Sequence, residues 1–163
     1  MDMAQLATRT GIPVRRLRYA WDHRVLPGLS SEIAGQGIPR TFDDFEGFGI
    51  ALAAQLLDSG LTRKLVAACL DVACSRPVRS PPKTDPPLLH AYRATASELL
   101  IGDGRYLQIR AARRLGIVNG IDTGWMPLTL EFVLPADYVP AVLVRVDLDR
   151  LVKSVRDDQS ERR

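Results

Sequence analysis

The chain has 163 residues, of which 46% are hydrophobic and 25% are charged, and its formal net charge is +3. This composition is typical of an ordinary globular protein that builds one substantial core or two small ones. The N-terminus lacks the basic and then apolar layout of a signal peptide, and no run of about 20 apolar residues could cross a bilayer. We therefore expect a cytoplasmic protein with no membrane partner.

The first predicted element is a pair of helices in residues 4–19, with the sequence AQLATRTGIPVRRLRY. The first helix is expected over residues 4–10, where Asp2 could cap it. Gly11 supplies the left-handed backbone conformation that ends a helix. Pro13 suits the first turn of the next helix, where its missing N–H costs nothing. The stretch therefore predicts a helix, a tight turn and a second helix.

The second of these helices carries three arginines on its predicted outer side. Val14 and Leu17 fall on the buried side by helical spacing, which leaves Arg15, Arg16 and Arg18 facing outward. Guanidinium groups in a major groove can pair with guanine or bind phosphate, and the hydroxyl of Tyr19 can add a backbone contact. We interpret the stretch as a DNA-binding helix-turn-helix. The alternative is a small helical hairpin whose arginines are simply solvated.

Positive charge is concentrated around this stretch. Residues 9–40 hold six basic side chains against two acidic ones, although the net charge of the whole chain is modest. Residues 30–40 form a glycine-containing loop that ends at Arg40, where a wing would lie. An apolar helix is expected to start near Phe42 and to stop at Ser59-Gly60, and another is expected over residues 61–73.

The order of these elements resembles the mercury-resistance (MerR) regulator family over residues 2–74. The resemblance is carried by Leu6-Ala7, Thr10-Gly11, Arg18-Tyr19, Leu26-Pro27, Arg40 with Phe42, Asp43-Asp44, and Leu56 with Gly60. It implies a winged helix-turn-helix in which Arg15, Arg16, Arg18 and Tyr19 belong to the recognition helix and its phosphate contacts. It also implies that Arg40 contacts the DNA backbone from the wing. The wing departs from the family pattern because it has few basic residues.

The two cysteines, Cys69 and Cys74, lie in or just beyond the helix predicted over residues 61–73. They lack the nearby histidine or further cysteine that a tetrahedral zinc site needs. We interpret them as buried free thiols, and we expect no metal and no cofactor. The family resemblance implies an alternative, a metal or redox sensor, because some members bind metals or thiol reagents through cysteines.

A domain boundary is predicted at residues 76–87, RPVRSPPKTDPP, which contain five of the 11 prolines in the chain. Closely spaced prolines forbid a helix and favour an extended, semi-rigid connector. This is the largest departure from the family, whose members commonly continue into a long dimerisation helix. The family's mode of dimerisation and its DNA-distorting mechanism are therefore not expected here.

A small α+β domain is predicted over residues 88–157, followed by a disordered tail at residues 158–163. Its expected elements are a helix over residues 88–100, strands over residues 106–111, 128–133 and 141–146, and a closing helix over residues 148–156. As an alternative, residues 99–101 leave the helix and form a hairpin with residues 106–111. Leu148, Leu151, Val152 and Val155 form an apolar stripe that could pair two copies or close the core of the domain.

Three features of this domain look like parts of an enzyme, and each has a simpler explanation. His90 is a lone histidine, which is more often a surface or hydrogen-bonded side chain than a catalytic one. Asp122-Thr123-Gly124 matches the loop of an aspartic protease over only three residues, without a second copy in the chain. Trp125 is most simply a core or interface residue. We predict no catalytic residue and no enzyme.

The predicted fold class is α+β, with a MerR-like winged helix-turn-helix at residues 1–75, the linker, and the small α+β domain. The function that we expect is a sequence-specific transcriptional regulator that binds double-stranded DNA. The C-terminal domain would sense an effector that the sequence does not identify, or pair with a second copy of the chain. Two alternatives stay open: a DNA-architectural or excisionase-like accessory protein, and a protein-interaction adaptor.

Overall fold

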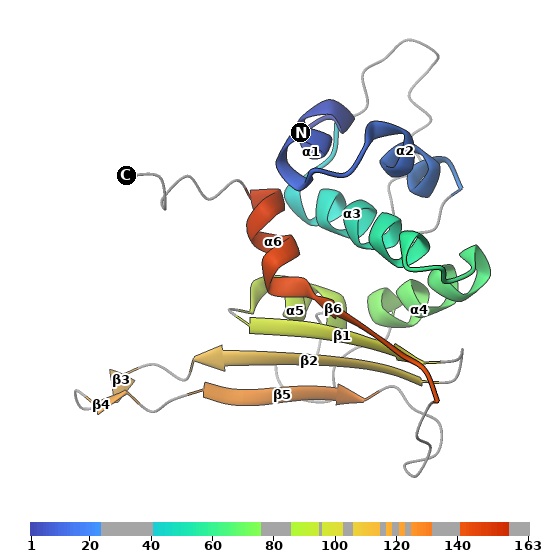
Figure 1. Ribbon diagram of the computed structural model, residues 1–163. Helices are drawn as coiled ribbons and strands as arrows, with labels where there is room; N and C mark the ends of the chain where they lie inside the picture. The colour runs from blue at the N-terminus through green and yellow to red at the C-terminus, as the bar shows by residue number, and fades with distance from the viewer. Residues whose placement is uncertain are drawn as a thin grey trace. The chain divides into compact units, whose positions relative to one another are not determined.

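The computed structural model describes residues 1–23, 41–75, 86–94, 96–102, 106–114, 117–118, 121–122, 125–131 and 141–156. Helices and an antiparallel sheet make the chain α+β, as predicted (Figure 1). Met1–Cys74 and Arg150–Arg163 form one compact unit, and Ser75–Asp149 form the second. None of the described helices combines the length and the apolar character that a membrane crossing requires. The predicted wing with Arg40, most of the proline-rich linker and the C-terminal tail lie outside the described residues.

Helices build the first unit. They are α1 (Met3–Thr10), α2 (Val14–Asp22), α3 (Asp44–Asp58), α4 (Arg63–Ser75) and the larger part of α6 (Leu148–Arg156). Helices α1, α2 and α3 pack against one another. Their shared core includes Leu6, Leu17 and Phe48, each fully buried.

The turn between α1 and α2 has the predicted geometry. Asp2 caps α1 by accepting a hydrogen bond from the N–H of Gln5 at 2.8 Å. Gly11 follows α1 with φ 71°, a left-handed conformation that favours a residue without a side chain. Ile12 is buried and Pro13 precedes the first residue of α2. The prediction of two short helices joined by a tight turn is confirmed.

Helix α3 forms the centre of the first unit. Asp43 and Glu46 cap its N-terminus reciprocally, with the N–H of Glu46 donating to the Asp43 carboxylate at 2.7 Å. Nine of its 15 residues are buried, because it is apolar on nearly every side. Gly60, with φ 90°, lies in the turn to α4. The predicted stop at Ser59-Gly60 is confirmed, and α4 begins two residues later and ends two residues later than predicted.

Helix α6 has the predicted bounds, but it is not confined to the second unit. It begins at Leu148, directly after a strand of that unit, and its residues from Arg150 onward group with the first unit. The backbone oxygen of Val155 accepts a hydrogen bond from Arg9 of α1 at 2.8 Å. The apolar stripe, Leu148, Leu151, Val152 and Val155, is buried within the single chain. This differs from the expected assignment of residues 88–157 to one separate domain.

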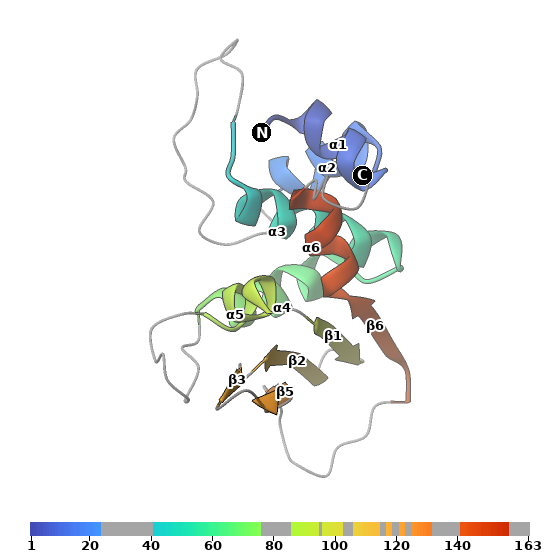
Figure 2. The same ribbon diagram turned by 90° about the vertical axis from the view of Figure 1, so that its left-hand side faces the viewer.

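The second unit is a helix on a sheet. The strands are β1 (Ala96–Gly102), β2 (Tyr106–Arg114), β5 (Trp125–Glu131) and β6 (Leu143–Asp147), in the antiparallel order β5-β2-β1-β6, with β3 (Ile117–Val118) and β4 (Ile121–Asp122) as a separate pair. Helix α5 (Pro87–Arg93) packs on β1 and β2 (Figure 2). The hydroxyl of Ser97 donates to the backbone oxygen of Ala91, which ties the sheet to α5.

The predicted helix over residues 88–100 is wrong beyond Arg93. Ala94 has an extended ψ of 164°, and the chain then enters β1. Leu99 and Ile101 pair with Ile109 and Leu107 in β2, which confirms the alternative hairpin. The apolar residues of this segment fit helical spacing, but strand pairing with distant residues decided its conformation, a tertiary effect that local periodicity does not report.

Candidate nucleic-acid interface

Helix α2 separates its apolar and basic side chains between opposite sides. Leu17 and Ala20 are buried, as the spacing of the apolar residues requires. Arg15, Arg16, Arg18 and Tyr19 are all exposed, and 46% of Tyr19 is accessible to solvent. The four predicted recognition residues on this helix therefore share one solvent-facing surface. Arg40, the fifth predicted residue, lies outside the described residues.

One of these arginines is held by an ion pair within the protein. Nη1 of Arg16 lies 2.6 Å from Oδ1 of Asp58, the last residue of α3. The two side chains are 55% and 40% exposed, so water screens the pair and its contribution to stability is small. Its main effect is on the charge that α2 presents, because Asp58 neutralises one of the three guanidinium groups.

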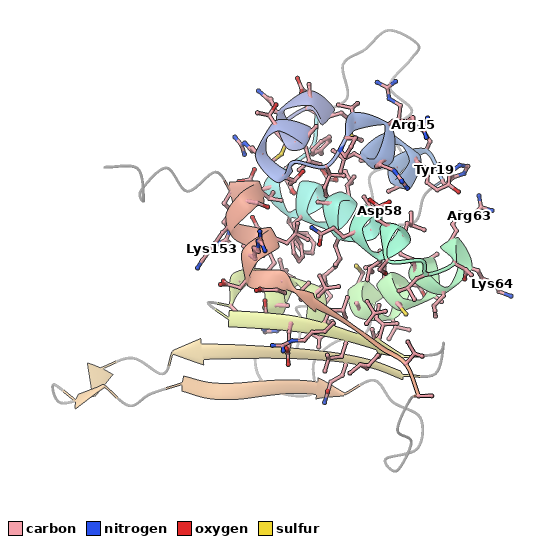
Figure 3. The ribbon with its side chains drawn as sticks, viewed as in Figure 1. Arg15, Tyr19, Asp58, Arg63, Lys64 and Lys153 are labelled. Carbon is pink, nitrogen blue, oxygen red and sulfur yellow. The ribbon has the colours of Figure 1, made fainter. Side chains whose placement is uncertain are left out.

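The C-terminal end of α2 contacts the start of α4. The rings of Tyr19 and His23 meet edge to face, with centroids 4.3 Å apart. Nη1 of Arg63 lies 3.1 Å from Nδ1 of His23. Because arginine can only donate, the histidine nitrogen is the acceptor in this hydrogen bond. These contacts place Arg63 beside α2, and Figure 3 shows Arg15, Tyr19, Arg63 and Lys64 on one side of the first unit.

Arg63 and Lys64 extend the basic surface, and the sequence analysis did not single them out. They occupy the first turn of α4, which contains no acidic residue. The positive end of the helix dipole disfavours cations there, whereas an anion near the same N–H groups would be stabilised. Two cations at the start of a helix were a signal that the sequence analysis could have used. The hydrogen bond between Arg63 and His23 joins residues 40 positions apart, so no local feature of the sequence indicates it.

The cysteines of the first unit are poor candidates for a reactive or metal site. Burial raises the pKa of the Cys69 thiol from 9.0 to about 11. Burial and, secondly, the negative charge of Asp71 raise the pKa of Cys74 to about 11. Both are free thiols. Protonated thiols are weak nucleophiles and weak metal ligands, and the described residues include no group of three or more potential metal ligands.

Of the three candidate residues of the second unit, His90 alone has a side chain that the structure describes. Nε2 of His90 is buried and has no hydrogen-bond partner there, contrary to the expectation of a surface or hydrogen-bonded histidine. Asp122 lies in β4 and Trp125 starts β5. The side chains of both residues, and the rest of the Asp-Thr-Gly match, lie outside what the structure describes.

Comparisons of the chain with models of protein families, with curated proteins and with solved structures gave no match.

Proposed function

We propose that the chain is a sequence-specific regulator that binds double-stranded DNA through the first unit, with α1 and α2 as the helix-turn-helix of a MerR-like winged domain. One observation carries the proposal. Leu17 and Ala20 bury one side of helix α2 in the core, while its arginines and Tyr19 face solvent. A short helix of this kind fits the major groove, where exposed guanidinium groups can read guanine or bind phosphate.

The start of α4 supports the same proposal. Arg63 and Lys64 would bind the sugar-phosphate backbone next to the groove that α2 enters, since the His23 contact places Arg63 beside that helix. Backbone contacts fix the register of a protein on DNA without reading sequence. The interface thus has a base-reading part on α2 and a phosphate-binding part on α4.

The proposal does not include the family's dimerisation by a long helix after the winged domain. Helix α4 ends at Ser75, immediately before the proline-rich residues, and its 13 residues are too few for the sustained heptads of a coiled coil. Pairing of two copies, where it occurs, is proposed to involve the second unit.

The test is selection of DNA from a random pool, followed by binding measurements on variants of the whole chain. Arg15→Ala should relax discrimination at one base pair by about 1–3 kcal/mol, the usual value of a bidentate contact. Arg18→Ala should weaken binding to all sequences and lower the salt slope by about one. Lys153→Ala is the matched control, because it removes one exposed positive charge on α6, at the other side of the unit in Figure 3.

Wild-type affinity in both arginine variants at moderate salt would contradict DNA binding by α2. The protein-interaction adaptor would then be the better interpretation. Uniform loss of affinity in all three variants, the Lys153 control included, would indicate non-specific attraction of a basic protein to DNA.

A further inference from the structure

The arginines of α2 are divided between two flanks with different environments. Residues three, four and seven positions apart lie on one side of a helix, which groups Arg16 with Tyr19 and His23. We name these three residues the tethered flank, because Arg16 contacts Asp58 and His23 contacts Arg63. Arg15 and Arg18 lie on the other side of the helix together with the exposed Asp22, and we name the two arginines the open flank. Neither makes an ion pair or a hydrogen bond through its side chain within the described part of the chain.

The position of Asp58 is unfavourable for α3 itself. A carboxylate in the last turn of a helix faces the negative end of the helix dipole. The ion pair with Arg16 contributes little to the free energy of unfolding, because both side chains are substantially exposed. Neither helix stability nor the strength of the pair therefore accounts for a carboxylate at this point. Its clear effect is on the charge and orientation of Arg16.

We propose that Asp58 is a positioning residue that holds Arg16 away from DNA, so that on this helix base reading belongs to Arg15 and phosphate binding to Arg18. This inference rests on the proposed DNA binding by α2. By neutralising one of three adjacent cations, Asp58 lowers the electrostatic attraction that every DNA sequence shares. Affinity for the correct site depends on base contacts of the open flank, which Asp58 does not touch. The attraction that all sequences share cancels from the ratio of specific to non-specific binding. The pair raises this ratio because a released Arg16 could bind whichever phosphate is nearest on random DNA, whereas on the correct site the base contacts of the open flank fix the position of α2.

The proposal changes the role that the sequence analysis gave to Arg16. From the sequence, Arg16 was expected to face outward like Arg15 and Arg18 and to contact base or phosphate with them. The structure separates them, since within the described part of the chain only Arg16 has a carboxylate partner, with Nη1 2.6 Å from Oδ1 of Asp58. Arg16→Ala leaves the Asp58 carboxylate unpaired, which repels every DNA sequence alike. It should therefore keep the ratio of specific to non-specific affinity within about twofold of wild type, in contrast to the loss of discrimination expected for Arg15→Ala.

The experiment measures binding of full-length variants to two fluorescent duplexes over a range of salt concentrations. One duplex is a pool of random sequence, and the other is the sequence that the wild-type protein selects from that pool. In Asp58→Asn, released Arg16 should bind an additional phosphate, raising the salt slope on random DNA by about one and tightening that binding several-fold. Affinity for the selected duplex should rise less, so the specificity ratio should fall.

Two further variants separate this mechanism from a simple change in net charge. Asp44→Asn removes the same charge from the opposite end of α3, where Asp44 lies 3.8 Å from Arg9. It should leave the specificity ratio unchanged. The double variant Arg16→Ala with Asp58→Asn should lose the gain seen in Asp58→Asn, because that gain requires the Arg16 guanidinium.

The inference would be overturned if Asp58→Asn and Asp44→Asn changed the specificity ratio equally. It would also be overturned if the tighter binding to random DNA persisted in the double variant. A loss of discrimination in Arg16→Ala as large as that in Arg15→Ala would be the third contrary result. Failure of the proposed function looks different. In that case Arg15→Ala and Arg18→Ala also bind like wild type, and no duplex is selected from the pool. The exposure of Arg16 and Asp58 favours folding of every variant, which circular dichroism would check.

Discussion

The two thiols of α4 illustrate how burial fixes the chemistry of single residues. Cys69 and Cys74 have pKa values raised to about 11, mainly because the thiolate would lose its hydration. At neutral pH both remain protonated, so a sensor mechanism that needs thiolate would require the helix to open. Both thiols are free, as predicted, but only Cys69 is buried, and Cys74 is half-buried.

The raised pKa of Cys69 predicts a loss of stability at alkaline pH. Its folded pKa of about 11 lies above the unfolded value of 9.0, so its contribution is fully present below pH 9 and is lost as the pH rises toward 11. The loss should be no more than roughly 3 kcal/mol, since one pKa unit corresponds to about 1.4 kcal/mol. Urea unfolding of wild type and Cys69→Ala at pH 7.5 and pH 10.5 would measure it.

The comparison in that experiment is between the two pH values within each variant. Removing the thiol also leaves a small cavity, which lowers stability at every pH and does not affect the slope. Cys69→Ala should therefore be less sensitive to alkaline pH than wild type. An identical decrease in both proteins would mean that other groups cause the alkaline loss and that the Cys69 thiolate is tolerated in the folded state.

Residue-level predictions from the sequence were accurate where helical spacing decides the outcome. The period of 3.6 residues placed Leu17 inside and Arg15 and Arg18 outside, and the structure agrees. The contacts of Arg16 with Asp58 and of His23 with Arg63 join positions about 40 residues apart. Spacing within one helix carries no information on such contacts, so the two flanks of α2 could not be distinguished in advance.

Helix boundaries were predictable where capping residues define them. Asp2, Gly11 and Asp43 each satisfy or end the backbone hydrogen bonding of a terminus, and α1 and α3 begin or end where these residues stand. No glycine or proline follows Arg93 to mark the end of α5 there, so the predicted helix was carried on to residue 100. Its second half joins β1 because strands β2 and β6 offer partners on both sides.

Helix α6 had correct bounds and an unexpected place in the fold. The sequence shows an amphipathic stripe but not the surface that covers it. In the structure, the hydrogen bond from Arg9 to the backbone of Val155 joins the end of α6 to α1, and Arg9 also lies near Asp44 at the start of α3. A segment from the C-terminus thus completes the unit that carries the candidate DNA-binding helices.

Shortening a buried side chain of α6 should therefore destabilise the first unit. Leu151→Ala is expected to lower its free energy of unfolding by about 2–5 kcal/mol, the usual range for a buried leucine. Trp21 of α2 can report on this unit alone if the other tryptophan is replaced in both proteins as Trp125→Phe. Fluorescence during urea unfolding would then give the stability of the first unit.

Lys153→Ala is the matched control on the same helix, because Lys153 is exposed whereas Leu151 is buried. It should change the Trp21 transition by less than about 0.5 kcal/mol. An unchanged Trp21 transition in Leu151→Ala would show that α6 supports only the second unit, as the sequence analysis had assumed.

At the scale of the whole molecule, the structure narrows the surfaces that could pair two copies. The apolar stripe of α6 is buried within one chain and is therefore not a surface that pairs two copies. Strand β6 lies at an edge of the sheet order, and Val142 and Leu143 at its start are exposed. An exposed strand edge can pair with its copy across a two-fold axis. Self-association therefore remains a proposal about β6.

The two units are connected by the chain in two places, and this changes what cutting the linker should do. The proline-rich sequence alone predicts two folded halves after such a cut, because few contacts cross an extended connector. However, a cut between residues 81 and 86 leaves α6 on the C-terminal fragment, whereas its residues from Arg150 onward belong to the first unit. We therefore expect the two fragments to stay together after the cut.

A site for a specific protease, inserted between residues 81 and 86 of the full-length protein, would test this expectation. After cleavage, both fragments should elute together from a sizing column, since separation would expose Leu151, Val152 and Val155 to water at a cost of roughly 1.5–3 kcal/mol for each large side chain. Leu151→Ala should weaken the association, and Lys153→Ala should not. The contrary result has two parts: the fragments elute separately, and the Trp21 unfolding transition of residues 1–81 equals that of the uncut protein. It would show that α6 contributes nothing to the first unit and that the proline-rich residues alone mark the boundary between the two units.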